Sequence, residues 1–128
     1  MALTTDLDIF KQATALLDLA VDVQANIPRA FRASMGTRIA DECVEMLVLI
    51  ARANSARVAA DRAGHIEQLL ERLDVTNILM RAAHSKKLIS QKLWASSIQL
   101  TGSIGKQAGG WLKSARAGNA RTSAAPAA

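Results

Sequence analysis

The sequence predicts an all-α protein folded as an antiparallel, up-down four-helix bundle, and three observations lead to that prediction. Half of the 128 residues are hydrophobic, enough to fill the core of one domain of this length. The chain has only two prolines, no tyrosine, two phenylalanines and two tryptophans, a composition that favours helix over sheet. Finally, apolar residues recur at helical spacing in four segments joined by short connections.

The first two helices are predicted over residues 5–27 and from residue 34 or 37 to residue 54. Pro28 should end the first helix, because the residue before a proline resists helical geometry. The apolar stripe of the second helix consists of Ile39, Cys43, Met46, Leu47 and Ile50. Its outward side is expected to carry Asp41, Glu42, Glu45 and Arg52.

The third helix, predicted over residues 57–84, is apolar on two sides in its second half. One face continues the core stripe of the other helices, and the opposite face consists of Val75, Ile78, Leu79 and Ala82. A helix that is apolar on both sides must pack against a partner on each side. We therefore expect these four residues to form the interface of a homo-oligomer, the alternative being a central helix in an irregular monomer.

The fourth helix is predicted over residues 90–115, with Ser90 as its N-cap. Lys92, Gln99, Lys106 and Lys113 recur every seven residues, so they form a ridge opposite the apolar arc that carries only positive charge. The bundle is accordingly assigned to residues 1–116. Residues 117–128 lack hydrophobic periodicity and are expected to be a disordered tail.

Charge is strongly segregated along the chain. Residues 75–128 contain eight basic side chains and no acidic one, residues 1–28 contain one Lys and four Asp, and residues 29–74 are balanced. A one-sided positive field attracts polyanions, and nucleic acid is the simplest such partner because phosphate contacts release counterions. The alternative is a solvated basic face that only keeps the protein soluble.

Two basic clusters lie near predicted turns. Arg29, Arg32 and Arg38 surround the first turn, where they could contact phosphate or pair with carboxylates such as Asp41 and Glu42. Arg81, Lys86 and Lys87 lie near the third turn. No aromatic residue interleaves with them on a loop, so phosphate contacts rather than base stacking are expected, with weak sequence specificity.

The sequence contains no persuasive catalytic, metal or cofactor site. The two histidines, His65 and His84, lie 19 residues apart on one helix, and Gly102 to Lys106 lacks the spacing of a phosphate-binding loop. Cys43, the only cysteine, is expected in the core and can form no internal disulfide. No segment reaches the roughly 18 apolar residues of a membrane span. We therefore expect a cytoplasmic protein that is not an enzyme, holds no metal or cofactor, and does not enter a membrane.

From residue 27 to residue 116 the chain resembles the accessory variability determinant proteins of diversity-generating retroelements. The segments that carry the resemblance are, in order, Ile27-Pro28-Arg29 with Phe31-Arg32, Met35-Gly36-Thr37-Arg38-Ile39, Ala51-Arg52-Ala53-Asn54, the run from Arg81 to Ser90, Gly102-Ser103-Ile104-Gly105 and Gly109-Gly110-Trp111-Leu112-Lys113. Related four-helix proteins are encoded in intervening sequences of bacterial ribosomal RNA genes. The run Ala40-Asp41-Glu42-Cys43-Val44 argues against that branch.

The resemblance implies a small basic four-helix bundle that assembles as a pentameric ring, binds RNA and DNA, and associates with the retroelement's reverse transcriptase during mutagenic cDNA synthesis. The accessory protein is not itself the polymerase. The charged surface that would contact nucleic acid or polymerase consists of Arg29, Arg32, Arg38, Arg81, Lys86, Lys87, Lys92, Lys106, Lys113 and Arg116. Which of these contact the template RNA or cDNA and which contact the polymerase stays open. The alternative functions are a helical adaptor for an acidic protein and an intervening-sequence-type protein.

Overall fold

Four long helices make up most of the chain in a computed structural model that describes the backbone of residues 3–124 and the side chains of residues 3–120. They are α1 (Asp8–Asn26), α3 (Thr37–Ser55), α4 (Ala59–Ser85) and α5 (Gln91–Ala124). A 3-10 turn (Thr4–Asp6) precedes α1, and the short α2 (Arg29–Phe31) and a π-helical turn (Arg32–Gly36) link α1 to α3. The residues described contain no strand, so the predicted all-α class is confirmed.

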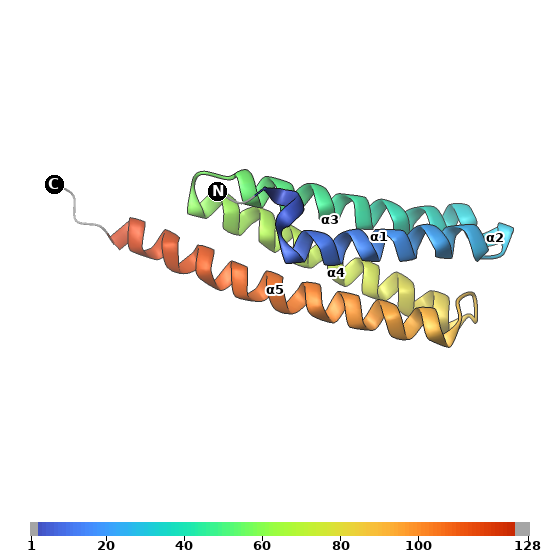
Figure 1. The fold of residues 1–128 in the computed structure, drawn as a ribbon. Coiled ribbons are helices and arrows are strands. Elements are labelled where there is room, and N and C mark those ends of the chain that lie inside the picture. The colour runs from blue at the N-terminus through green and yellow to red at the C-terminus, as the bar shows by residue number, and fades with distance from the viewer. Residues whose placement is uncertain (1–2, 125–128) are drawn as a thin grey trace.

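The helices run alternately up and down, because each connection is short and reverses the chain (Figure 1). α1 packs against α3 and α5, and α4 packs against the same two helices, so the four close around one core. The core contains Leu16 and Val23 from α1, Met46 and Ile50 from α3, Ile66, Leu69 and Met80 from α4, and Ile104 from α5, each at most 1% exposed. Burying each such side chain stabilises the fold by roughly 1.5–3 kcal/mol.

Three of the helix ends follow from local sequence chemistry. α1 ends before Ile27, whose extended backbone (ψ 145°) is the one that Pro28 requires. At the start of α5 the Leu93 N–H donates to the Ser90 hydroxyl at 3.1 Å, which confirms the predicted N-cap. α4 ends in a Schellman turn, in which Lys87 adopts a left-handed backbone (φ 60°).

The link between α1 and α3 is tied to both helices. The Arg32 side chain donates to the carbonyl oxygens of Ile27 (3.3 Å) and Ala25 (3.4 Å), which α1 leaves without partners at its end. The Gln24 amide donates to the Thr37 hydroxyl at 3.1 Å, joining the end of α1 to the start of α3. Gly36 is buried at this crossing.

α5 extends further than the sequence pattern indicated. It continues to Ala124, so residues 117–124, expected as part of a disordered tail, are helical, while residues 125–128 lie outside the described chain. Alanine-rich sequence has high helix propensity, which compensates for the missing hydrophobic periodicity. A Cβ at Gly118 would lie 3.6 Å from the Ala59 side chain, so α5 still touches the start of α4 there.

Two details of packing differ from the prediction. In α3 the buried leucine is Leu49, 1% exposed, whereas Leu47 is only partly buried, because α3 faces both α1 and α4 and its core side is broader than one stripe. Gly105 and Gly109 lie four residues apart, a spacing that predicts close approach of a neighbouring helix at both, and only Gly105 allows it. A Cβ there would lie 3.3 Å from Leu73, whereas one at Gly109 would meet nothing within 4 Å.

The glycine at the α1–α3 crossing gives a first prediction. A Cβ at Gly36 would lie 3.2 Å from both the Cα and the Cγ of Gln24, so Gly36→Ala must displace the α1 backbone and should lower the free energy of unfolding by about 1–2 kcal/mol. Gly64, inside α4, has open space around it. Gly64→Ala should therefore raise stability by roughly 0.5–1 kcal/mol. Urea denaturation of both variants checks this, and equal effects of the same sign would contradict it.

Candidate nucleic-acid interface

The up-down topology brings two basic clusters that are far apart in sequence to one end of the bundle. The α1–α3 link and the α4–α5 turn lie at the same end in Figure 1. We call this region the basic end, and it comprises Arg29, Arg32, Arg38, Arg81, Lys86, Lys87 and Lys92. All seven residues are exposed. Asp22 and Asp41, each about one turn from the end of its helix, are exposed close to them.

The α4–α5 turn holds its two lysines in a defined backbone. The Leu88 N–H donates to the Ala83 carbonyl at 2.8 Å and the Lys87 N–H to the His84 carbonyl at 2.9 Å, the two bonds of a Schellman motif. A left-handed residue closes such a turn, and here that residue is Lys87. Lys86 and Lys87 therefore lie at the exposed tip of a well-ordered reversal of the chain rather than on a loose loop.

The arginines of the α1–α3 link do not act alike. Arg32 is exposed but donates to two backbone carbonyls, so it stabilises the link besides contributing charge. Arg29 and Arg38 make no side-chain hydrogen bond or ion pair within the described residues. The sequence left two roles for these arginines, contact with phosphate and pairing with nearby carboxylates. Pairing with Glu42 does not occur, because Arg72 occupies that carboxylate.

The predicted ridge on α5 is exposed along its length and leads away from the basic end. Lys92, Lys106 and Lys113 are all exposed, as is Gln99 between them. Seven residues of helix span about 10 Å, so successive lysines of the ridge are about 20 Å and about 10 Å apart. Arg116, further along, pairs with Glu67 at 3.1 Å, and both side chains are more than half exposed. All ten predicted basic residues thus lie on the surface.

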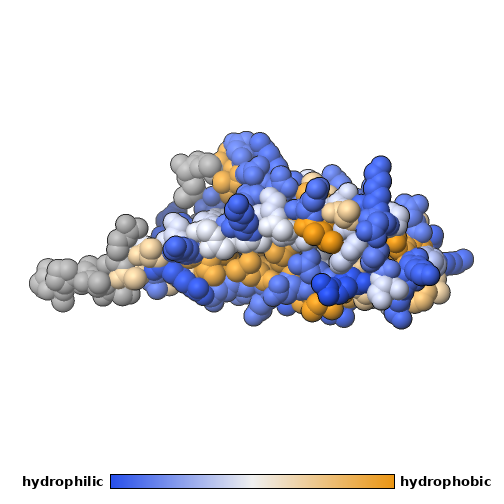
Figure 2. Space-filling model, turned by 90° about the horizontal axis from the view of Figure 1, so that it is seen from below, coloured by the Kyte–Doolittle hydropathy of each residue, from blue (hydrophilic) through white to orange (hydrophobic). Residues whose placement is uncertain are grey.

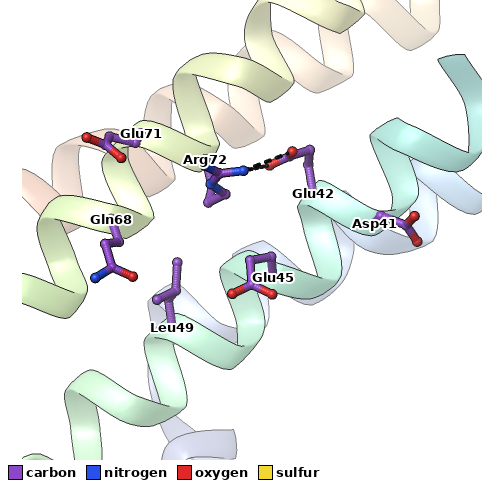
Figure 3. Close-up of a pocket in the computed structure, with 7 residues that line it drawn as sticks. All are labelled: Asp41, Glu42, Glu45, Leu49, Gln68, Glu71 and Arg72. Carbon is purple, nitrogen blue, oxygen red and sulfur yellow. Dashed lines mark hydrogen bonds and ion pairs between the residues drawn. The ribbon is translucent and has the colours of Figure 1, made fainter. Parts of the chain in front are cut away.

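A groove between α3 and α4, of about 610 Å³, is acidic where the basic end is cationic (Figure 3). Asp41, Glu42, Glu45 and Glu71 line it, with Leu49, Gln68 and Arg72. Glu42 was expected to face outward, yet it is 9% exposed, because the Arg72 guanidinium donates to both of its carboxylate oxygens at 3.2 and 3.3 Å. With four carboxylates and one guanidinium among its lining residues, this groove is unfavourable for phosphate.

An aromatic pair, which the sequence pattern did not predict, lies directly behind the basic end. The rings of His84 and Trp94 stack nearly parallel, with centroids 5.1 Å apart and planes 8° apart. His84 Nε2 lies 2.8 Å from the Gln91 side-chain oxygen. The two rings come from different helices, so no motif within either helix predicts that they stack. Only the antiparallel packing of α4 on α5 brings them together.

The four residues predicted to form an oligomer interface differ in their exposure. Ile78 is 66% exposed, whereas Val75, Leu79 and Ala82 are partly buried and Leu79 packs against the core. Figure 2 shows hydrophobic residues gathered in a band among hydrophilic ones on the side that includes α5. Exposed apolar surface therefore exists, and at Ile78 it is prominent.

The single cysteine lies buried inside the bundle. Burial, with the neighbouring Glu42 charge, raises the pKa of the Cys43 thiol to about 12, so the thiol stays protonated and unreactive. No three His, Cys, Asp or Glu side chains of the described chain are arranged to hold a metal ion. None of its helices is long and apolar enough to cross a membrane.

Comparison with known proteins gives one informative result. A family model described as bAvd-like matches residues 8–115, from the start of α1 through most of α5. The resemblance predicted from the sequence is thereby confirmed. No curated protein and no solved structure matches the chain.

The two ion pairs should differ sharply in their effect on stability. Arg72→Ala leaves the nearly buried Glu42 carboxylate without its partner and should lower the free energy of unfolding by about 1–3 kcal/mol. Arg116→Ala breaks an exposed pair and should change it by less than about 0.5 kcal/mol. Chemical denaturation measures both variants. Adding Glu42→Leu to Arg72→Ala should recover much of the loss, and a loss that persists in full would point to a different role for Arg72.

Proposed function

The chain belongs to the bAvd-like family, and we propose that it is a non-enzymatic accessory protein of a diversity-generating retroelement that binds nucleic acid and the element's reverse transcriptase. In this role it holds template RNA and nascent cDNA beside the polymerase, which carries out the mutagenic synthesis. Family membership supports the accessory role. The observation that carries the nucleic-acid part is the gathering of seven exposed basic residues at one end of the bundle.

The arrangement of charge favours binding through phosphates. The basic end and the α5 ridge together present nine exposed cationic side chains, while the acidic groove lies apart between α3 and α4. Each phosphate neutralised releases condensed counterions, so affinity should depend steeply on salt. Contacts of this kind position a strand without reading its sequence, and weak sequence specificity should follow.

Assembly into a ring would strengthen such binding. The family resemblance implies a pentamer, and five copies of a +5 chain would carry a charge of about +25. Several weak sites on one particle also bind a polymer more tightly than one site does. The exposed Ile78, with the partly buried Val75, Leu79 and Ala82, is the surface that we assign to contacts between copies.

Removing charge from the α4–α5 turn tests the nucleic-acid role. The triple variant Lys86→Gln/Lys87→Gly/Lys92→Gln should weaken RNA binding by at least about tenfold and reduce the salt slope by about two, since each lost phosphate contact removes roughly 0.7. Each single change should cost only about two- to threefold. Glycine is used at residue 87 because the backbone there is left-handed.

The measurement is filter binding of single-stranded RNA over a series of salt concentrations. Lys11→Gln, which removes an exposed charge at the start of α1, far from the basic end, is the matched control and should bind as the unaltered protein does. Binding by the unaltered protein that does not change with salt would contradict the phosphate-driven role and favour an adaptor for an acidic protein.

A charge at Ile78 tests the assembly. Ile78→Lys should dissociate the oligomer to the 13.6 kDa chain without lowering the helix content of that chain, because the side chain is 66% exposed and adds little to the core. Val21→Lys, on α1 and 49% exposed, is the control and should leave the assembly intact. Sedimentation velocity gives the result, and a monomeric unaltered protein at micromolar concentration would remove the ring from the proposal.

A further inference from the structure

A hollow opens between α4 and α5 just behind the basic end. Asn77 and Arg81 line it from α4, and Trp94, Ile98, Thr101 and Gly102 line it from α5. Its volume is about 340 Å³, at the lower end of the range for small-ligand sites. A second hollow of about 420 Å³, lined by Asp74, Asn77, Ile78 and Arg81, shares two of these residues and continues the depression along α4.

The aromatic wall of the hollow is held in place. Trp94 is partly exposed, and His84 stacks on one side of its ring. His84 is itself fixed by the contact between its Nε2 and the Gln91 side-chain oxygen. Another flat ring could therefore stack only on the side of the indole that His84 leaves uncovered. A ring ordered before binding loses little conformational entropy when it receives a ligand.

The space exists because one lining residue has no side chain. A Cβ at Gly102 would meet no atom within 4 Å, so no neighbouring side chain fills the volume there. Ile98, 48% exposed, provides an apolar edge. Thr101 already donates its hydroxyl to the Ile98 carbonyl at 3.3 Å. Asn77 and Arg81, which make no side-chain hydrogen bond within the described chain, are the polar groups left to meet a ligand.

These groups match an unpaired nucleotide. An indole ring stacks on any base, and a side-chain amide can both donate to and accept from a base edge. A guanidinium binds phosphate, and Lys86, Lys87 and Lys92 lie at the adjoining turn for the neighbouring phosphates. The one carboxylate, Asp74, lines only the second hollow, so the base and phosphate would lie on the Trp94 side.

The site is compatible with the surface assigned to assembly. Asn77 and Arg81 face α5, whereas Gln68, Glu71 and Arg72 line the groove toward α3. Val75 lies seven residues from Gln68, and Leu79 seven from Arg72, so both belong to the α3 side of the helix. Only Ile78, on the outer face between the two sides, borders the second hollow.

We propose that the hollow between α4 and α5 is a nucleobase pocket, in which Trp94 stacks on one unpaired base of a single strand whose phosphates lie on the basic end. The pocket rests on the nucleic-acid binding proposed above and adds a preference for single strands that carry bases. Phosphate attraction alone provides no such preference, because it acts equally on an abasic strand.

The test compares a short oligo(dA) with an abasic oligonucleotide of the same length and charge. Trp111→Phe leaves Trp94 as the only tryptophan, so its fluorescence reports the pocket directly. The oligo(dA) should quench Trp94 and bind about tenfold more tightly than the abasic strand, whereas the abasic strand should leave the fluorescence unchanged.

A variant that fills the pocket provides the decisive comparison. Gly102→Leu should abolish the preference for oligo(dA) while leaving abasic binding and its salt dependence unchanged. Gly109→Leu, on the same helix and outside the hollow, is the matched control and should keep the preference. Both glycines have open space around them, and leucine is the better helix former, so both variants should fold.

The outcomes separate this pocket from the broader function. Equal, salt-dependent binding of both strands, or a preference that survives Gly102→Leu, would overturn the pocket and leave the accessory role intact. Binding of neither strand would overturn both. If Gly102→Leu changed the sedimentation of the protein and not its strand preference, the hollow would instead be a protein contact, and the nucleobase pocket would be wrong.

Discussion

The reversal of the chain between α4 and α5 is the constraint on which the rest of the structure depends. Two hydrogen bonds close it, from Leu88 to Ala83 and from Lys87 to His84. They fix where α5 starts relative to α4, and with that the pairing of residues along both helices. The stack of His84 on Trp94, the approach of Gly105 to Leu73 and the contact of Gly118 with Ala59 all follow from this one register.

Charge separation in this protein is a property of the fold as well as of the sequence. The C-terminal half of the chain carries the excess positive charge, but the arginines near the first turn belong to a balanced segment. The up-down topology adds them to the lysines of the α4–α5 turn. It also gathers the three carboxylates of α3 and Glu71 of α4 into a separate groove, where Arg72 is the one cation among the lining residues. The electrostatic field around the molecule is therefore asymmetric, and it would orient an approaching nucleic-acid strand.

Sequence patterns predicted the elements of the bundle well and its specific contacts poorly. Helical periodicity and the signals at Pro28 and Ser90 were sufficient for the four helices, because a helix buries its apolar side wherever the partner lies. Glu42 was misplaced because its burial depends on Arg72, 30 residues away. The stacked pair and the hollow beside it arise only where two helices meet. α5 extends beyond its predicted end because its last residues have high helix propensity, and the spacing of hydrophobic residues carries no information about that.

The left-handed backbone at Lys87 has a consequence for how this fold could change. A residue with a Cβ pays roughly 1 kcal/mol in that conformation, and glycine would avoid this penalty. Redesign for heat resistance alone would select glycine at this position, and in doing so would erase a cation from the tip of the molecule. Conformational stability and positive charge are thus set against each other at this one residue.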